Sequence, residues 1–186
     1  MESKYFNKET ISLMQRTESN RRSSESFFSS KSDNDNFFGS STGNSLKVVG
    51  VEHIKGSAGV GAFNVVKFDD GHQMSTSKFF AAKGLKWPVG GNVAKLNYLC
   101  SALETGVEVS VTPEKVESKP MQRKDGTYVG PKGSDGKTVV LQPIELKDDK
   151  GKPTGQFKAP EGALEAVTYY FVPMEMPEVE LVSWEE

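Results

Sequence analysis

The chain has 186 residues, a formal net charge of −2 and a single cysteine, Cys100. One cysteine excludes an intramolecular disulfide or a thiolate metal cluster within one chain, which favours a reducing compartment. No apolar run approaches the roughly 18 residues of a membrane span, and the residues after Met1 do not resemble a signal peptide. We therefore expect a soluble intracellular protein without a membrane partner, in the cytoplasm, or in the virion if the source is viral.

Charge is distributed unevenly along the sequence. Residues 1–44 are neutral overall, residues 175–186 carry five glutamates and no basic residue, and residues 45–174 have a net charge of +3. A mildly basic body can bind a polyanion, and an acidic tail can compete for the same surface. The alternative is that the tail only keeps the chain soluble.

Residues 1–44 form a Ser-rich head with eleven Ser and five Asn but no Val, Ala, Pro or Trp. Such a segment buries too little apolar surface to offset its ordering entropy, which predicts disorder. Residues 5–16 either form a short helix on a partner or stay unstructured. A Phe-Phe-containing pattern occurs twice, ten residues apart, and predicts partner binding unless it arises by chance or docks on the chain itself. Its residues are Phe27, Phe28, Phe37 and Phe38.

Order is expected to begin near Leu46, in a β-rich region. Residues 46–55 and 63–68 are rich in β-branched residues, as strands are. The Asp-Gly pair in the turn 69–72 predicts a tight hairpin, with residues 73–80 as the returning strand.

Further elements follow from the same signals. Residues 81–85 predict at most one turn of helix, and the remaining strand candidates are 92–99, 107–111, 138–146 and 166–172. Eight of the nine prolines lie between Pro113 and Pro177, and Asp-Gly pairs recur at 125–126 and 135–136, which argues against long helices there and for hairpins or an extended arm. A first set of five strands, with a helical turn between the third and fourth, matches the element order of an oligonucleotide-binding (OB) barrel. The fold class expected is therefore mainly β, a small barrel or sandwich with an OB-like order as one possibility.

These observations predict three regions. Residues 1–44 are the flexible head, residues 45–174 are the β domain, and residues 175–186 are the acidic tail. The β domain contains an extended basic segment at about 113–137, rich in Pro and Gly. Such a segment either wraps a polyanion, reaches a neighbouring subunit or is an inert solvated excursion.

No catalytic or metal-binding pattern emerges. The glycines at 56, 59 and 61 match neither common nucleotide-binding fingerprint. His53 and His72 lie on different predicted strands, so nothing brings them together around a metal. Cys100 stands between apolar neighbours, which predicts a buried thiol with a raised pKa. We expect no enzyme activity, no metal and no cofactor.

Aromatic residues interleaved with lysines are the strongest binding signal. Single-stranded nucleic acid is bound by rings that stack on bases and cations that follow phosphates. In a regular strand, neighbouring side chains point to opposite faces, so one ring of the Phe79-Phe80 pair is expected at the surface. Ordinary core packing is the competing interpretation. The predicted nucleic-acid-binding residues are Lys67, Lys78, Phe79, Phe80, Lys86, Trp87, Arg123, Lys124 and Tyr128.

The sequence thus predicts a non-enzymatic binding module for single-stranded nucleic acid whose termini dock protein partners. In the tail, Trp184 is either tucked into the domain or offered to a partner. The alternative function is a structural or assembly protein, for example a virion component, whose head and basic segment order against neighbouring subunits of a homo-oligomer.

Overall fold

The described part of the chain forms two compact units. The computed structural model describes residues 5–20, 43–56 and 61–184. Residues 118–167 form one unit, here called the arm, and the other described residues form the second, here called the body. Strand residues outnumber helical residues, at 41% against 21%, which confirms the mainly β prediction. None of the helices in these ranges has both the length and the apolar character that crossing a membrane requires.

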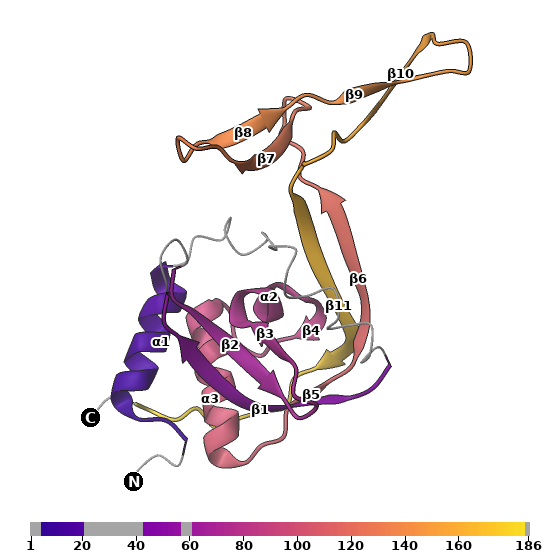
Figure 1. Cartoon of the computed structure of the whole chain (residues 1–186). Helices are drawn as coiled ribbons and strands as arrows, with labels where there is room; N and C mark the ends of the chain where they lie inside the picture. Colours follow the sequence, from indigo (N-terminus) through magenta and orange to yellow (C-terminus); the bar gives the residue numbers. More distant parts are fainter. Residues whose placement is uncertain (1–4, 21–42, 57–60, 185–186) are drawn as a thin grey trace. The chain divides into compact units, whose positions relative to one another are not determined.

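The first sheet of the body has four strands and curls into a half-barrel (Figure 1). In the order in which they pair, its strands are β3 (Gln73–Ser75), β2 (Phe63–Phe68), β1 (Leu46–Ile54) and β5 (Ser110–Val111). The predicted hairpin turn is confirmed between β2 and β3. Gly71 has a φ of 89°, and the backbone N–H of His72 donates to Asp70 Oδ1 at 2.9 Å.

A second sheet contains the two strands through which the chain enters and leaves the arm. Its order is β4 (Lys83–Lys86), β11 (Glu165–Glu175) and β6 (Pro113–Pro120), with β4 and β11 parallel. The strands β4 and β11 approach closely at Gly84, whose φ is 96°. A Cβ atom there would lie 2.1 Å from the carbonyl oxygen of Phe171, so only glycine fits this position.

The N-terminal helix α1 (Lys8–Asn20) is packed within the body, without a partner protein. It lies against β2 and α3 and buries Ile11 and Met14 completely. Glu18 is also buried, and its Oε1 accepts hydrogen bonds from Asn64 Nδ2 and Thr76 Oγ1. Of the two alternatives for residues 5–16, the structure shows a helix, which spans residues 8–20 and packs within the body, whereas composition predicts an unpacked head. Ile11 and Met14, three positions apart, form an apolar face of the helix that cannot be recognised from the overall composition of the head. The rest of the head, residues 21–42, lies outside the described residues.

The strand predicted over residues 73–80 is wrong beyond Ser75. The chain turns into helix α2 (Thr76–Ala81), and the Ser75 Oγ accepts a hydrogen bond from the backbone N–H of Lys78. A helix separates consecutive side chains by about 100°, so both Phe79 and Phe80 can face the core, as a strand would not allow. Their exposed fractions are 0% and 4%, so the expectation that one ring lies at the surface is also wrong.

The strand predicted over residues 92–99 is wrong as well, because this segment begins helix α3 (Asn92–Thr105). Helix α3 is buried on several sides, so its apolar residues show no clear 3.6-residue period. The turn of helix predicted over residues 81–85 is wrong after Ala81, which ends α2, because residues 83–86 form β4. With a helix where the fourth strand was predicted, the OB-like order is not confirmed.

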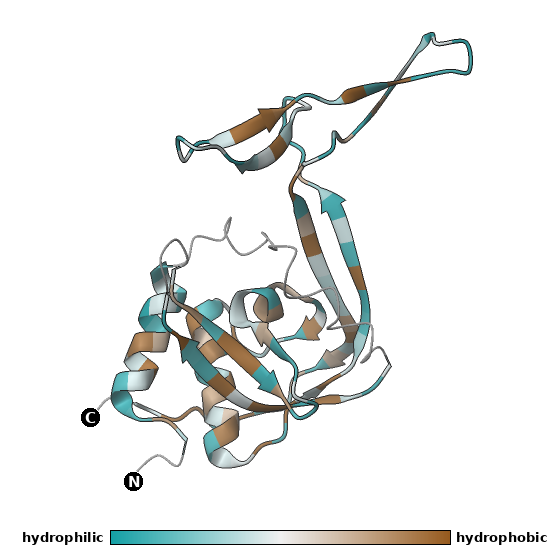
Figure 2. Cartoon of the chain, viewed as in Figure 1, coloured by the Kyte–Doolittle hydropathy of each residue, from teal (hydrophilic) through white to brown (hydrophobic). Residues whose placement is uncertain are grey.

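The arm consists of β-hairpins, as the proline and Asp-Gly pattern predicts. The strands β7 (Tyr128–Lys132) and β8 (Thr138–Leu141) pair with each other, as do β9 (Ile144–Lys147) and β10 (Pro153–Lys158). Residues 138–146, predicted as one strand, are thus two strands from separate hairpins. Figure 2 shows that much of β8 is hydrophobic although its residues are largely exposed.

The acidic tail packs along the body without forming a strand. Met176 is 6% exposed, and Tyr98 donates its hydroxyl hydrogen bond to the carbonyl of Pro177 at 2.5 Å. The Val182 backbone N–H donates to Ser101 Oγ at 3.0 Å, and the Trp184 ring meets Phe6 edge-on at 6.0 Å. Of the two alternatives for Trp184, the structure shows the ring tucked into the domain.

Candidate nucleic-acid interface

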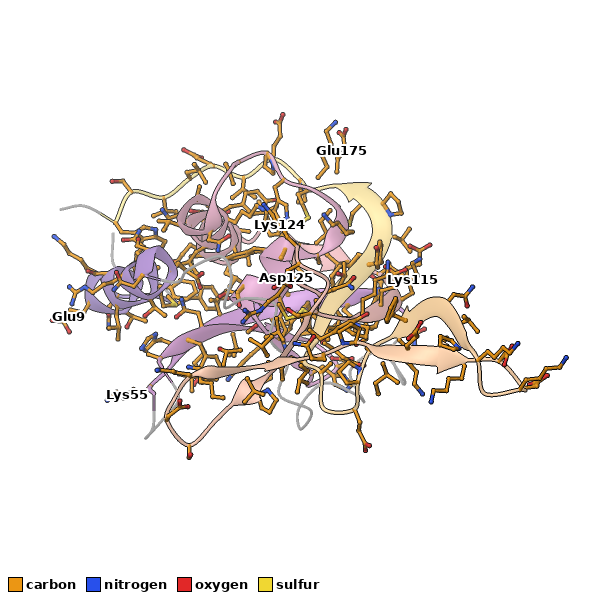
Figure 3. All side chains as sticks on the ribbon, turned by 90° about the horizontal axis from the view of Figure 1, so that it is seen from above. Glu9, Lys55, Lys115, Lys124, Asp125 and Glu175 are labelled. Carbon is orange, nitrogen blue, oxygen red and sulfur yellow. The ribbon has the colours of Figure 1, made fainter. Side chains whose placement is uncertain are left out.

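Two of the three body lysines predicted to bind nucleic acid form ion pairs with neighbouring carboxylates. Lys67 forms an ion pair with Glu52 on the adjacent strand β1, and Lys86 pairs with Glu175 at 2.7 Å. Two further body lysines follow the same pattern, in the pairs Lys47–Glu108 and Lys115–Glu117. Figure 3 labels Lys115 and Glu175 among the body side chains. The positive charge of these four lysines is therefore compensated locally, whereas the exposed Arg16, Lys55 and Lys83 of the body form no ion pair with a described carboxylate.

The aromatic side chains predicted to stack on bases lie in the core of the body. Phe79 is surrounded edge-on by Phe68, Trp87 and Phe171, at centroid distances of 5.7 to 5.8 Å. Trp87 also contacts Phe80 and Tyr98. Phe79 and Phe80 are buried and have no free face for a base, and Trp87, whose burial is intermediate, packs its ring against both, so the core-packing interpretation is the one that the geometry supports for them.

Two other lysines near this cluster are also engaged. Lys95 donates from Nζ to the carbonyl of Phe80 at 3.1 Å and lies 5.4 Å from the centre of the Trp87 ring. Desolvation by burial lowers the pKa of Lys95. Lys78, one of the predicted binding residues, lies on α2, whose first turn is capped by Ser75. Neither position resembles the lysine-bearing strand face that the sequence predicts.

The predicted cations of the arm are placed differently, at an exposed turn. Arg123 and Lys124 lie in the turn that leads into β7, and both are exposed. The next residue, Asp125, accepts hydrogen bonds from the backbone N–H and the hydroxyl of Thr127, and these bonds are the main cause of its lowered pKa. Lys124 and Asp125 are labelled in Figure 3. The Asp125 carboxylate is thus committed to the turn, while neither Arg123 nor Lys124 forms an ion pair with a described carboxylate.

The same turn geometry occurs three times in the arm. In each turn a glycine with positive φ donates its backbone N–H to the carbonyl three residues earlier, and an Asp oxygen accepts a backbone N–H inside the turn. The glycines are Gly126, Gly136 and Gly151. Each turn therefore occupies an acidic side chain internally and leaves the basic residues beside it facing solvent.

As a result, the arm carries a set of exposed cations that form no ion pair with any carboxylate of the described residues. The arm has nine basic and seven acidic residues, a net charge of +2. Its exposed unpaired cations are Arg123, Lys124, Lys132, Lys137, Lys147, Lys150, Lys152 and Lys158. Tyr128, also predicted to bind, is only 9% exposed and pairs with Leu141 across the hairpin, so it serves packing.

Phe157 is the aromatic residue that sequence reasoning missed. It lies on β10 and is 57% exposed. The β9–β10 turn lacks the Asp-Gly pair that marks the other turns, because Lys150 precedes Gly151 and the capping aspartate, Asp148, stands earlier. The signal that could have revealed this hairpin is Asp148 followed three residues later by Gly151, shortly after the strand residues that begin behind Pro143.

No other chemistry-bearing cluster stands out among the described residues. Burial, and to a smaller extent the charge of Glu104, raise the pKa of the Cys100 thiol to about 12. His53 hydrogen-bonds Asn64, and His72 hydrogen-bonds Asp70. Within residues 5–20, 43–56 and 61–184, no three His, Cys, Asp or Glu side chains are placed to hold a metal ion. The Phe-Phe pairs at Phe27, Phe28, Phe37 and Phe38 lie outside the described residues, as do residues 57–60 of the glycine-rich loop.

Comparison of the chain with protein-family models, with curated proteins and with solved structures found no match. The function must therefore be inferred from the chain's own residues, and above all from the contrast between paired cations in the body and unpaired cations in the arm.

Proposed function

We propose that this chain is a non-enzymatic binding protein for nucleic acid, with single strands as the favoured ligand, and that the arm is its interface. The observation that carries the proposal is the contrast in charge pairing. Among the described residues, four body lysines have Glu partners and three exposed body cations, Arg16, Lys55 and Lys83, have no ion pair, whereas the smaller arm has eight exposed cations without one. An unpaired exposed cation can neutralise a phosphate at little cost, while a paired one must first give up its carboxylate.

The shape of the arm supports the same ligand. Hairpins joined by tight turns place cations at several separated points, a spacing that suits an extended polyanion better than a small anion. The exposed Phe157 ring adds an apolar surface close to Lys158 and Lys147. Rings beside cations are what binding of unpaired bases requires.

The test is a salt-dependent titration with paired double variants. Arg123→Gln/Lys124→Gln removes two unpaired cations, and the control Lys67→Gln/Lys86→Gln removes two paired ones with the same change in net charge. If both arm cations contact phosphates of an oligo(dT) probe, the slope of log K against log salt falls by about 1.4. The control should leave the slope nearly unchanged.

Two results would contradict the proposal. One is the absence of salt-sensitive binding by the unaltered chain. The other is an equal or larger change of slope in the control variant, which would locate the phosphate contacts on the body.

A second candidate function is favoured by one observation, the apolar exposure of the arm. Val139, Val140 and Ile144 are 39%, 43% and 43% exposed. Two-stranded ribbons are marginally stable alone in water, so their burial against a neighbouring subunit would stabilise them. In that case the chain is a structural or assembly protein, as in a virion. Defined oligomers in a light-scattering mass measurement, without salt-sensitive nucleic-acid binding, would support this function instead.

A further inference from the structure

Phe157 is distinguished by its exposure and by the strand geometry around it. Its exposed fraction of 57% is the highest among the large hydrophobic side chains of the described residues. The β9–β10 pairing changes register between Pro153 and Phe157, and Gly155 in that interval has a φ of 73°. Such an irregularity re-aims the side chains that follow it, and here it precedes an aromatic ring that is more than half exposed.

The neighbours of the ring are polar and mostly cationic. Phe157 lies directly opposite Glu145 in the pairing, so the two side chains share one face of the hairpin. Lys147, two residues further along β9, lies on that face as well. Lys158 follows the ring in sequence and pairs with Ile144 on the opposite face. Cations thus lie on both faces near the ring, while Glu145 is the one carboxylate beside it.

We propose, resting on the proposed function, that Phe157 is the base-stacking residue of the interface and that its ligand is an unpaired base. A flat ring with a free face accepts a base by stacking, and a base is available for this only where it is not paired and stacked in a duplex. The phosphates on either side of that base then lie toward Lys147 and Lys158, away from Glu145. The arm therefore favours single strands through base stacking on Phe157, a contact that the arm cations do not provide.

The experiment is a cycle that removes the ring, the base, or both. Fluorescence anisotropy measures the affinity of the full chain for oligo(dT) and for an abasic oligonucleotide with the same number of phosphates. Phe157→Ala should weaken oligo(dT) binding roughly 5- to 150-fold, which corresponds to about 1 to 3 kcal/mol per stacked base. Affinity for the abasic strand should not change. The matched control is Ile144→Ala, an exposed apolar residue of the same hairpin on its other face, which should leave both affinities unchanged.

A second variant guards against loss of the hairpin. Phe157→Trp keeps a stacking ring, so it should retain oligo(dT) affinity and show quenching on binding beyond that of Trp87 and Trp184 in the unaltered chain. The inference is overturned if Phe157→Ala weakens both strands equally or neither, or if it changes only the oligomeric mass of the chain. Failure of the unaltered chain to bind either strand would instead overturn the proposed function.

Discussion

At the scale of single residues, the environment of Cys100 decides its chemistry. The side chain is fully buried on α3, and burial followed by the charge of Glu104 raises the pKa of the thiol from 9.0 to about 12. The reactive thiolate is therefore suppressed in the folded chain at neutral pH. This agrees with a structural role for Cys100 and gives no support to a nucleophilic one.

The expected consequence for Cys100 is low reactivity and a loss of stability in alkali. A thiol-specific reagent at pH 8 should label the native chain slowly and the denatured chain fully. Because the folded pKa is raised, the stabilisation is complete below pH 9 and is lost as the pH rises from 9 toward 12. Thermal unfolding from pH 8 to 10 should show a steeper decline for the unaltered chain than for Cys100→Ala. Rapid labelling of the native chain would refute the buried assignment.

The residues predicted to bind nucleic acid show what the sequence can and cannot predict about single side chains. Lys67 and Lys124 look equivalent in the sequence, since each stands near a turn with an Asp-Gly pair. What separates them is Glu52, which lies on a neighbouring strand and reaches Lys67 only after the sheet has formed. Local sequence could predict a cation at both positions, but long-range strand pairing decides which cation is left without a partner.

At the scale of elements, the acidic tail is packed on the body, whereas the sequence predicts a separate region. Pro177 and Val182 form hydrogen bonds with Tyr98 and Ser101 of α3, and Met176 is buried and donates its backbone N–H to the carbonyl of Lys86. We therefore expect the tail to contribute to stability, where composition alone predicts that its removal changes little.

A matched pair of substitutions tests the docking of the tail. Met176→Ala should lower the free energy of unfolding by about 2 kcal/mol or more, because it leaves a cavity against the core. Leu181→Ala, in the same segment but 55% exposed, should change it by less than about 0.5 kcal/mol. Urea unfolding followed by circular dichroism gives both values. Equal, small effects would mean that the tail is not docked in solution.

The elements that the sequence could predict are those with local signals. The strands near 46–54 and 63–68 and the Asp-Gly turns of the arm follow from β-branched residues and turn chemistry within a few positions. Helix α3 was missed because its burial on several sides removes the periodic pattern, and α2 was missed because Phe79 and Phe80 look like strand residues until the core is known. Tertiary burial, which no local window contains, decided both.

At the scale of the whole molecule, the two units differ in burial and in the pairing of their charges. The body buries the aromatic cluster and pairs four of its lysines with carboxylates, whereas the arm buries little and leaves eight exposed cations without an ion pair among the described residues. The formal net charge of −2 conceals this division, because the five glutamates of the tail belong to the body. A low net charge therefore does not exclude polyanion binding when most of the exposed cations without an ion pair lie in one unit.

The measurement that tests this account most directly is ultraviolet crosslinking of bound oligo(dT) to the full chain, followed by mass spectrometry of the peptides. The account predicts crosslinks in residues 118–167, with Phe157 and the turn at Arg123 and Lys124 among the modified sites, and a decrease of these crosslinks at high salt. Crosslinks confined to residues 61–111 of the body, or a complete absence of salt-sensitive crosslinks, would contradict it.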